Sequence, residues 1–149
     1  MQTFLPYEDF ERCASVLDYR RLGKQRVETL QILQAIAFDT RWRNHAATKM
    51  WVGYEVALIA YGSIVCMEWL DRGYKDACHA KIGAFTEIFG DEVELPHWLG
   101  DEDLHASHRS NLIRKDAGYY RQFFDEPSTY PYIWPRGKFE ENEKKTVKK

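Results

Sequence analysis

Helical spacing of apolar residues is the feature that most restricts the fold of this 149-residue chain. Apolar side chains recur three or four positions apart through most of the sequence, whereas alternating strand patterns are scarce. We therefore expect an all-α protein, a single compact helical domain of five to six helices. The spacing predicts helices over residues 8–17, 18–38, 44–71, 75–89 and 101–115, and a short sixth over 118–124.

The last part of the chain differs in composition from the rest. Three prolines between residues 127 and 135 exclude another long helix there. The aromatic segment 130–135 is expected to be extended and to pack back on the body. Residues 137–149 are rich in Lys and Glu with almost no apolar content, which is typical of a disordered tail. We therefore predict one domain over residues 1–136 and a charged, disordered tail over 137–149.

Charge is distributed unevenly along the chain. The formal net charge is −2, but residues 136–149 hold six Lys/Arg against three Asp/Glu. Residues 1–135 therefore hold 15 Lys/Arg against 20 Asp/Glu, a net charge of −5. This balance excludes a uniformly basic surface for nucleic acid, so any site for a polyanion must be concentrated. The densest group of cations in the body is Arg20, Arg21, Lys24 and Arg26.

The predicted helix over 18–38 also carries a polar stripe. At about 100° per residue, four side chains share a stripe roughly 80° wide. On a half-buried helix, such a stripe would face into a concavity. The alternative interpretation is a solvated face with ion pairs between residues three or four positions apart, such as Asp18 with Arg21. The stripe consists of Asp18, Arg21, Gln25 and Glu28.

A second polar group lies on the predicted helix over 101–115. Two histidines three positions apart can ligate a metal, but no further ligands accompany them, so we predict no metal. Phosphate contact, or histidines hydrogen-bonded between packed helices, is the expected role. The group consists of His105, His108, Arg109, Arg114 and Lys115.

A third candidate is the pair Asn44-His45 at the start of a predicted helix. Asn44 is a good N-cap, which is the structural interpretation. His45 at that place would feel the positive end of the helix dipole and stay neutral, able to accept or relay a proton.

Several absences narrow the possibilities. The three cysteines form no close pair, which favours free thiols in a reducing cytoplasm. The sequence begins without a signal-peptide pattern and has no apolar run that could span a bilayer. Serine-nucleophile motifs and phosphate-binding glycine loops are also absent. We expect a cytoplasmic protein with no membrane association and no cofactor, and the oligomeric state stays open.

Seven ordered segments carry a resemblance to known proteins. The set resembles a family of small bacterial and phage cytoplasmic proteins over residues 1–135. It is also distantly similar to the pyrimidine-dimer DNA glycosylases of the phage endonuclease V type. The segments are MQTFLPY (1–7), RLGKQRVE (21–28), NH (44–45), MWVGYE (50–55), PHWLG (96–100), SHRSNLIRKD (107–116) and YIWP (132–135).

The resemblance implies an endonuclease V-like helical enzyme whose own α-amine is the nucleophile. In such enzymes the amine attacks the sugar C1′ after a base is flipped and forms a Schiff base, and strand cleavage follows by elimination. A glutamate on the early helix assists. An α-amine suits this role because its unperturbed pKa is about 8, against about 10.4 for lysine.

Two positions depart from the resembled pattern. Gln2 is bulky, so we expect Met1 to be retained and its amine to stand one residue further out. Gln25 falls near the place of the catalytic glutamate, and Glu28, one turn on, could replace it only in a rearranged site. The candidate catalytic residues are therefore Met1, Gln2, Arg21, Gln25, Glu28 and His45. The candidate nucleic-acid-binding residues are Arg20, Lys24, Arg26, Asn44, His105, His108, Arg109, Arg114 and Lys115.

We predict a DNA glycosylase-like protein that acts on a damaged or modified base, with double-stranded DNA as its partner. Two other classes stay open. Gln25 and the retained Met1 are compatible with a non-catalytic nucleic-acid-binding module on the same scaffold. The body charge of −5 is compatible with a protein-interaction domain or an enzyme for free nucleotides.

Overall fold

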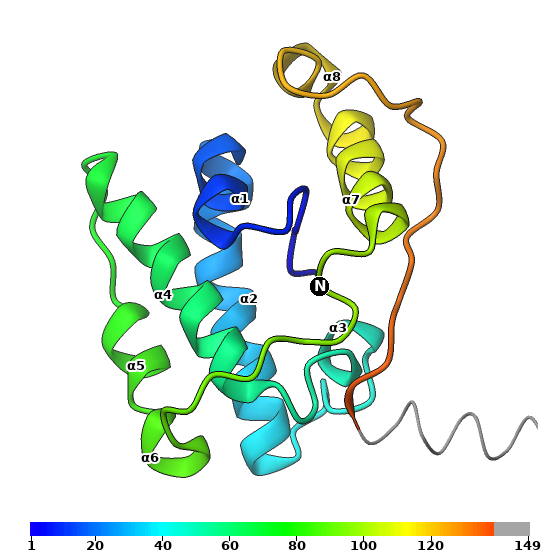
Figure 1. Cartoon of the computed structure of the whole chain (residues 1–149). Helices are drawn as coiled ribbons and strands as arrows, with labels where there is room; N and C mark the ends of the chain where they lie inside the picture. Colours follow the sequence, from blue (N-terminus) through cyan, green and yellow to red (C-terminus); the bar gives the residue numbers. More distant parts are fainter. Residues whose placement is uncertain (139–149) are drawn as a thin grey trace, which may run out of the picture.

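A computed structural model describes residues 1–138, and the regular elements in this part of the chain are all helices (Figure 1). The expected all-α class is confirmed. The helices number eight within the described residues, rather than five to six, because two expected helices are interrupted. They are α1 (Phe10–Val16), α2 (Tyr19–Phe38), α3 (Ala46–Lys49), α4 (Glu55–Asp71), α5 (His79–Gly83), α6 (Thr86–Phe89), α7 (Glu102–Lys115) and α8 (Ala117–Tyr120).

The two interruptions correct the sequence-based boundaries. The expected helix over 44–71 divides into α3 and α4, and Gly53 between them has a φ of 90°, which glycine adopts without strain. The expected helix over 75–89 divides into α5 and α6, which buries Ile82 and leaves Ile88 exposed. Helical spacing marks neither interruption, because both lie within apolar runs.

The packed pair of α2 and α4 forms the centre of the molecule. Leu22 and Ile32 of α2 and Leu58 of α4 are fully buried. Gly62 of α4 allows the close approach, because a Cβ atom there would lie 2.6 Å from Cγ2 of Thr29 on α2. The core thereby fixes the buried side of α2, and the polar stripe lies on this same side, in the N-terminal half of the helix.

The first nine residues form no helix. Residues 2–6 of this segment run through the interior of the molecule. Figure 1 shows this segment passing between α2 and α4 on one side and α7 on the other. The residues from Gln2 to Leu5 are buried, which is unusual for a chain end. The fold therefore fixes the N-terminus in place.

The segment after α8 packs back on the body, as expected from its aromatic and proline content. It runs beside α7 (Figure 1), and Tyr132 and Trp134 pack against the core. Gly137 N–H donates to the carbonyl of Lys49 (2.9 Å), and Lys138 N–H donates to that of Val52 (2.8 Å). The first two residues of the expected tail are thus bonded to the α3 region. Residues 139–149 lie outside the described part of the chain.

The three cysteines are free and buried. Burial raises the pKa of the Cys13 and Cys66 thiols to about 12, so both stay protonated at neutral pH. Among residues 1–138, no helix is both long and apolar enough to cross a membrane.

Candidate active site

The α-amine of Met1 lies beside the carboxylate of Glu28, with 3.6 Å between the amine nitrogen and Oε2. The Met1 side chain is only 3% exposed, although the residue as a whole is partly exposed. The exposed part of Met1 is therefore its backbone, which carries the amine. An amine next to a carboxylate can pass a proton to it and attack an electrophilic carbon.

The amine and Glu28 line a pocket of about 330 Å³. This volume lies within the range of small-molecule sites. The walls come from the N-terminal segment, α2, the end of α7 and the returning C-terminal segment. The lining residues are Met1, Gln2, Phe4, Arg20, Arg21, Lys24, Gln25, Glu28, Lys115 and Tyr132.

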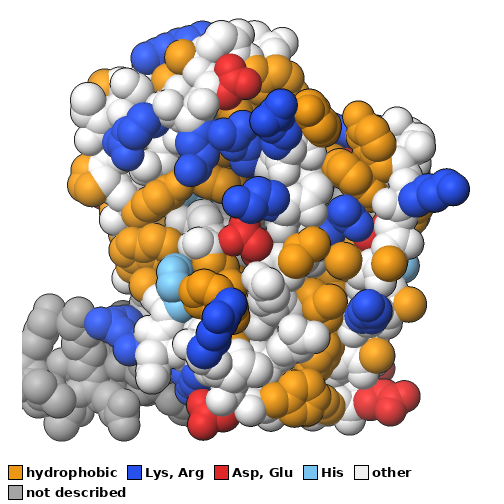
Figure 2. Space-filling model, turned by 180° about the vertical axis from the view of Figure 1, so that it is seen from behind, with side chains coloured by type: hydrophobic (Ala, Val, Ile, Leu, Met, Phe, Trp, Pro, Cys, Tyr) orange, Lys and Arg blue, Asp and Glu red, His pale blue; other side chains and the backbone are white. Residues whose placement is uncertain are grey.

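Cations surround this pocket. Arg20, Lys24 and Lys115 are exposed at its margin. Figure 2 shows Lys and Arg side chains gathered over the upper half of this face, where few acidic side chains lie. The net charge of the body is thus a poor guide to this surface, which can bind phosphate groups.

A second groove of about 440 Å³ adjoins the first. Arg20, Lys24 and Glu28 line both, because they follow one another at intervals of four residues along α2. The floor of the second groove includes Gly23 and Trp69, and a Cβ at position 23 would lie 3.1 Å from the indole ring. The glycine thus leaves the aromatic surface open beside the cations.

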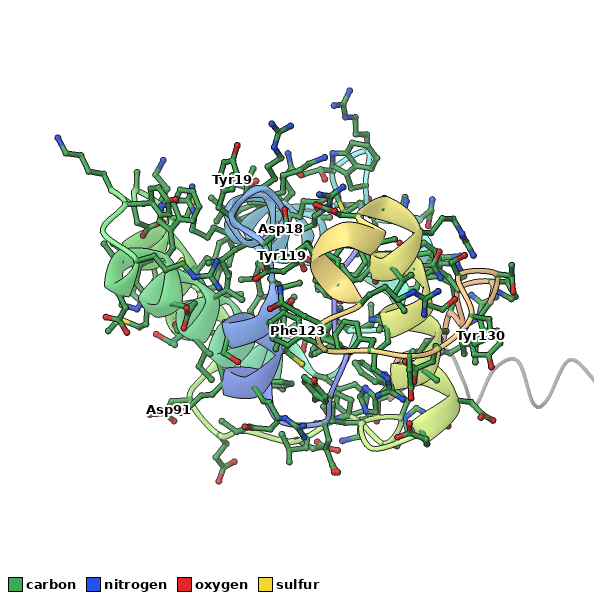
Figure 3. The ribbon with its side chains drawn as sticks, turned by 90° about the horizontal axis from the view of Figure 1, so that it is seen from above. Asp18, Tyr19, Asp91, Tyr119, Phe123 and Tyr130 are labelled. Carbon is green, nitrogen blue, oxygen red and sulfur yellow. The ribbon has the colours of Figure 1, made fainter. Side chains whose placement is uncertain are left out.

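The polar stripe of α2 divides between two roles. Gln25 and Glu28 face the pocket, as the interpretation of a stripe that faces a concavity predicts. Arg21 also lines the pocket, but it pairs with Asp18 (3.2 Å), as the alternative of ion pairs between residues three or four positions apart predicts. Figure 3 shows Asp18 between Tyr19 and Tyr119, where α8 lies beside the start of α2, and the Tyr120 hydroxyl donates to Asp18. Asp18 therefore fastens α8 to α2.

Gln25 is 1% exposed and holds the N-terminal segment against α2. Its Oε1 accepts from Phe4 N–H (2.8 Å) and from the Tyr61 hydroxyl (2.9 Å). Its Nε2 donates to the Gln2 carbonyl (2.9 Å). Sequence reasoning singled out Gln25 but not Tyr61, whose contact depends on how α4 packs.

His105 and His108 do not reach the pocket. The Leu5 N–H donates to Nδ1 of His108 (2.8 Å). Nε2 of His105 accepts from Gly100 N–H (2.9 Å), so its Nδ1 carries the proton and donates to the Leu5 carbonyl (2.7 Å). Burial lowers the pKa of His108 to about 3, which keeps it neutral. Of the two expected roles, the structure favours hydrogen bonding within the fold over phosphate contact.

Arg26 is directed away from the pocket. Its guanidinium pairs with Asp76 and lies 4.3 Å from the ring centroid of Trp69. This pairing, together with the hydrogen bonds to Asp76, lowers the pKa of that carboxyl against the opposing effect of burial. The expected contact between Arg26 and nucleic acid is replaced by a contact that fastens α2 to the segment before α5.

Arg109 and Arg114 also bond within the protein. Arg109 pairs with Glu126 (2.7 Å) and Glu102 and donates to the Pro6 carbonyl (2.8 Å). Arg114 donates to backbone carbonyls of the segment after α8. Neither lines the pocket, because each is directed toward the chain segments that α7 supports. Of the five polar residues predicted on this helix, only Lys115 is in the pocket.

His45, rather than Asn44, caps α3, because its Nδ1 accepts from Ala47 N–H (3.0 Å). Asn44 precedes the cap and is exposed. Burial, followed by the positive charge of the Met1 amine, lowers the pKa of His45, although Glu28 opposes this. His45 therefore lies within electrostatic reach of the amine without lining the pocket.

Sequence reasoning missed two aromatic walls of the pocket, Phe4 and Tyr132. The rings lie 6.4 Å apart between centroids. Burial raises the pKa of Tyr132 to about 12, so its hydroxyl stays protonated. Both belong to the segments that carry the resemblance, and only the path of the two chain ends brings them together.

Comparison with known proteins gives one match. Residues 1–82 match the model of a protein family described as pyrimidine dimer DNA glycosylase. This match assigns the chain to the class of DNA glycosylase-like proteins and implies DNA as the substrate, and the all-helical fold and the cationic pocket are compatible with this class. Because the match covers more than half of the chain, the chain belongs to the pyrimidine dimer DNA glycosylase family. No curated protein and no solved structure matches it.

Proposed function

We propose that this protein excises a damaged or modified base from double-stranded DNA, with the Met1 α-amine as nucleophile. The observation that carries the proposal is the 3.6 Å approach of this amine to Glu28 inside a cationic pocket. Membership of a DNA glycosylase family supports the substrate. All residues of the proposed site lie in residues 1–136, which we propose to act as one domain.

The chemistry begins with the unprotonated amine. Its nitrogen attacks C1′ of a flipped nucleotide, and the bond to the base breaks with its electron pair leaving on the base. Glu28 accepts the proton that the attacking nitrogen loses and passes it to the sugar ring oxygen O4′, so the C1′–O4′ bond breaks and the Schiff base forms. Glu28 is then again a carboxylate and stabilises the positive charge of the Schiff base. A proton lost from C2′ next allows the 3′ phosphate to leave, which cleaves the strand.

The rest of the pocket binds the substrate. Arg20, Lys24 and Lys115 contact the phosphates that flank the flipped nucleotide. Phe4 and Tyr132 contact its base, since aromatic walls bind bases without strict sequence preference. His45 stays neutral near the amine and relays protons through the solvent of the pocket.

Borohydride trapping tests the proposal. Duplexes that carry a pyrimidine dimer, other damaged bases or an abasic site are incubated with the protein and reduced, and the adduct is mapped by mass spectrometry. We expect an adduct on the Met1 nitrogen and base release from at least one duplex. No adduct and no base release across the panel would overturn the proposal.

Glu28→Gln separates chemistry from binding. We expect trapping to slow by about 10²- to 10⁴-fold, the usual contribution of a proton-transfer group. The Kd for the duplex is expected to stay within about threefold, because the phosphate-binding cations remain. Glu87→Gln removes an exposed carboxylate of α6 and serves as the matched control. Equal trapping by both variants would exclude Glu28 from the chemistry.

A nucleic-acid-binding module without catalysis is the second candidate. It is favoured by one observation, that Gln25 is uncharged and fully engaged in hydrogen bonds. This candidate requires salt-dependent binding of the same duplexes without an adduct.

A further inference from the structure

We infer that Gln25 is the positioning residue of this site, whose carboxamide sets the geometry between the Met1 amine and Glu28. The inference rests on the proposed function and adds a requirement to it. A neutral hydrogen-bond donor at position 25 is necessary for fast Schiff-base formation, although it makes no bond to the substrate.

The Nε2 group of Gln25 contacts the carboxylate of the amine–carboxylate pair and the residue next to the amine. It donates to the Gln2 carbonyl (2.9 Å), one residue from the amine, and it also approaches Oε1 of Glu28 (3.4 Å). The other oxygen of Glu28, Oε2, faces the Met1 amine. One amide group thus orients the carboxylate and the chain end together.

A carboxylate at position 25 could not do this. Both contacts of Nε2 are to oxygen atoms, and an ionised carboxylate has no hydrogen to donate. It would place a buried negative charge against the Gln2 carbonyl and the Glu28 carboxylate. The carboxylate at position 28 therefore requires an amide rather than a second carboxylate at position 25.

The remaining anchors of the segment act further from the amine. His105 and His108 hold the peptide of Leu5, and Phe4 N–H bonds to Oε1 of Gln25. Loss of the Nε2 donor alone therefore leaves the segment attached at residues 4 and 5. We expect it to displace the amine rather than to release the whole chain end.

Two variants isolate the donor. Gln25→Glu keeps the acceptor for Phe4 N–H and loses the donor, whereas Gln25→Met loses both at a similar size. Trapping on an abasic-site duplex is measured in single turnovers, relative to wild type at each pH. We expect both variants to trap about 100-fold more slowly at pH 8, the cost of a displacement near 1 Å, with a duplex Kd within about threefold.

The pH profile distinguishes positioning from a merely structural role. As pH falls, the introduced carboxyl group of Gln25→Glu gains a proton that it can donate, so its relative rate recovers at least tenfold between about pH 8 and pH 5. Gln25→Met has no such proton and stays slow at every pH. Parallel profiles for the two variants would overturn the inference.

Tyr61→Phe is the control for stability. It removes a hydroxyl that bonds to Gln25 Oε1 and the Phe4 carbonyl and leaves both Nε2 contacts in place. We expect a less stable protein that traps within about threefold of wild type. A loss as large as that of Gln25→Glu would show that general loosening slows trapping, and would also overturn the inference.

Hydrogen exchange of residues 1–7 separates this inference from the proposed function. If wild type forms no adduct, the proposed function fails. Faster exchange of the segment in Gln25→Glu than in Tyr61→Phe then still supports the positioning, and equal exchange overturns it. If wild type forms the adduct and Gln25→Glu traps equally fast, the positioning fails while the proposed function stands.

Discussion

Neighbouring cations of α2 divide between the exposed margin of the pocket and the packed body of the protein. Lys24 is exposed at the shared margin of two grooves, whereas Arg26, two positions on, is enclosed by Asp76 and Trp69. Both are cations in the same short basic run, and only packing distinguishes them. Removal of the charge is therefore expected to affect nucleic-acid binding at Lys24 and the stability of the fold at Arg26.

We expect Lys24→Ala to weaken duplex binding and Arg26→Ala to weaken the fold. Lys24→Ala removes one phosphate contact, so the slope of log Kd against log salt concentration falls by about one. Arg26→Ala leaves Asp76 partly buried and unpaired, which costs roughly 2 kcal/mol of unfolding free energy. Fluorescence anisotropy at several salt concentrations and urea unfolding check the two effects. An unchanged slope for Lys24→Ala would contradict its assignment.

Among the helices, α7 fixes the N-terminal segment in place through hydrogen bonds to its backbone. His105 and His108 lie three positions apart on one face of α7. His108 accepts a hydrogen bond from the backbone N–H of Leu5, and His105 donates one to its backbone carbonyl. The neutral form of His108 is essential here, because its Nδ1 must accept a hydrogen bond from Leu5 N–H. The attachment of the N-terminal segment, and with it the position of the Met1 amine, therefore depends on pH.

Stability is expected to fall on acidification. His108 has a pKa of about 3 in the folded protein and about 6.5 when unfolded, so the unfolded chain binds the extra proton between these values. The contribution is complete above about pH 6.5 and decreases toward pH 3, by about 2 kcal/mol at pH 5. Urea unfolding from pH 8 to pH 4 measures it. His108→Gln is the control, and an equally steep pH dependence in this variant would contradict the prediction.

At the scale of the whole molecule, both ends of the described chain meet the same body. The N-terminal segment fills the interior, and Gly137 and Lys138 bond to backbone carbonyls in and just after α3. Lys138 also pairs with Glu94 (2.7 Å). These contacts extend beyond the proposed domain over residues 1–136, and we propose that its boundary lies two residues later, at 138.

Two shortened chains test this boundary. A chain that ends at residue 138 keeps every described contact, and we expect the Tm and the trapping rate of the full chain within about 2 °C and threefold. A chain that ends at residue 135 loses two backbone hydrogen bonds, worth about 1 kcal/mol each, and its Tm falls by several degrees. Calorimetry and trapping check both. An equal Tm for the two chains would place the boundary earlier.

The sequence predicts the long helices better than the site. The spacing over 18–38 and over 101–115 gives the bounds of α2 and α7 within a residue or two, because amphipathic periodicity is local. The turn at Gly53 is not predicted, since apolar residues continue on both sides of it. The meeting of Met1 with Glu28 depends on the path of the N-terminal segment through the core, and no local pattern encodes that path.

If the Met1 amine is the nucleophile, as we propose, the residue at which the mature chain begins becomes part of the active site. Each residue added before Met1, or removed after synthesis, moves the nucleophile by about 3.8 Å along the chain. A change of that size exceeds its 3.6 Å separation from Glu28. The proposed function therefore predicts that an amino-terminal affinity tag or an acetyl group abolishes borohydride trapping while leaving the side chains and helices of residues 1–138 unaltered. Side-chain substitutions alone would not test the Met1 α-amine, because no codon substitution deletes an α-amine.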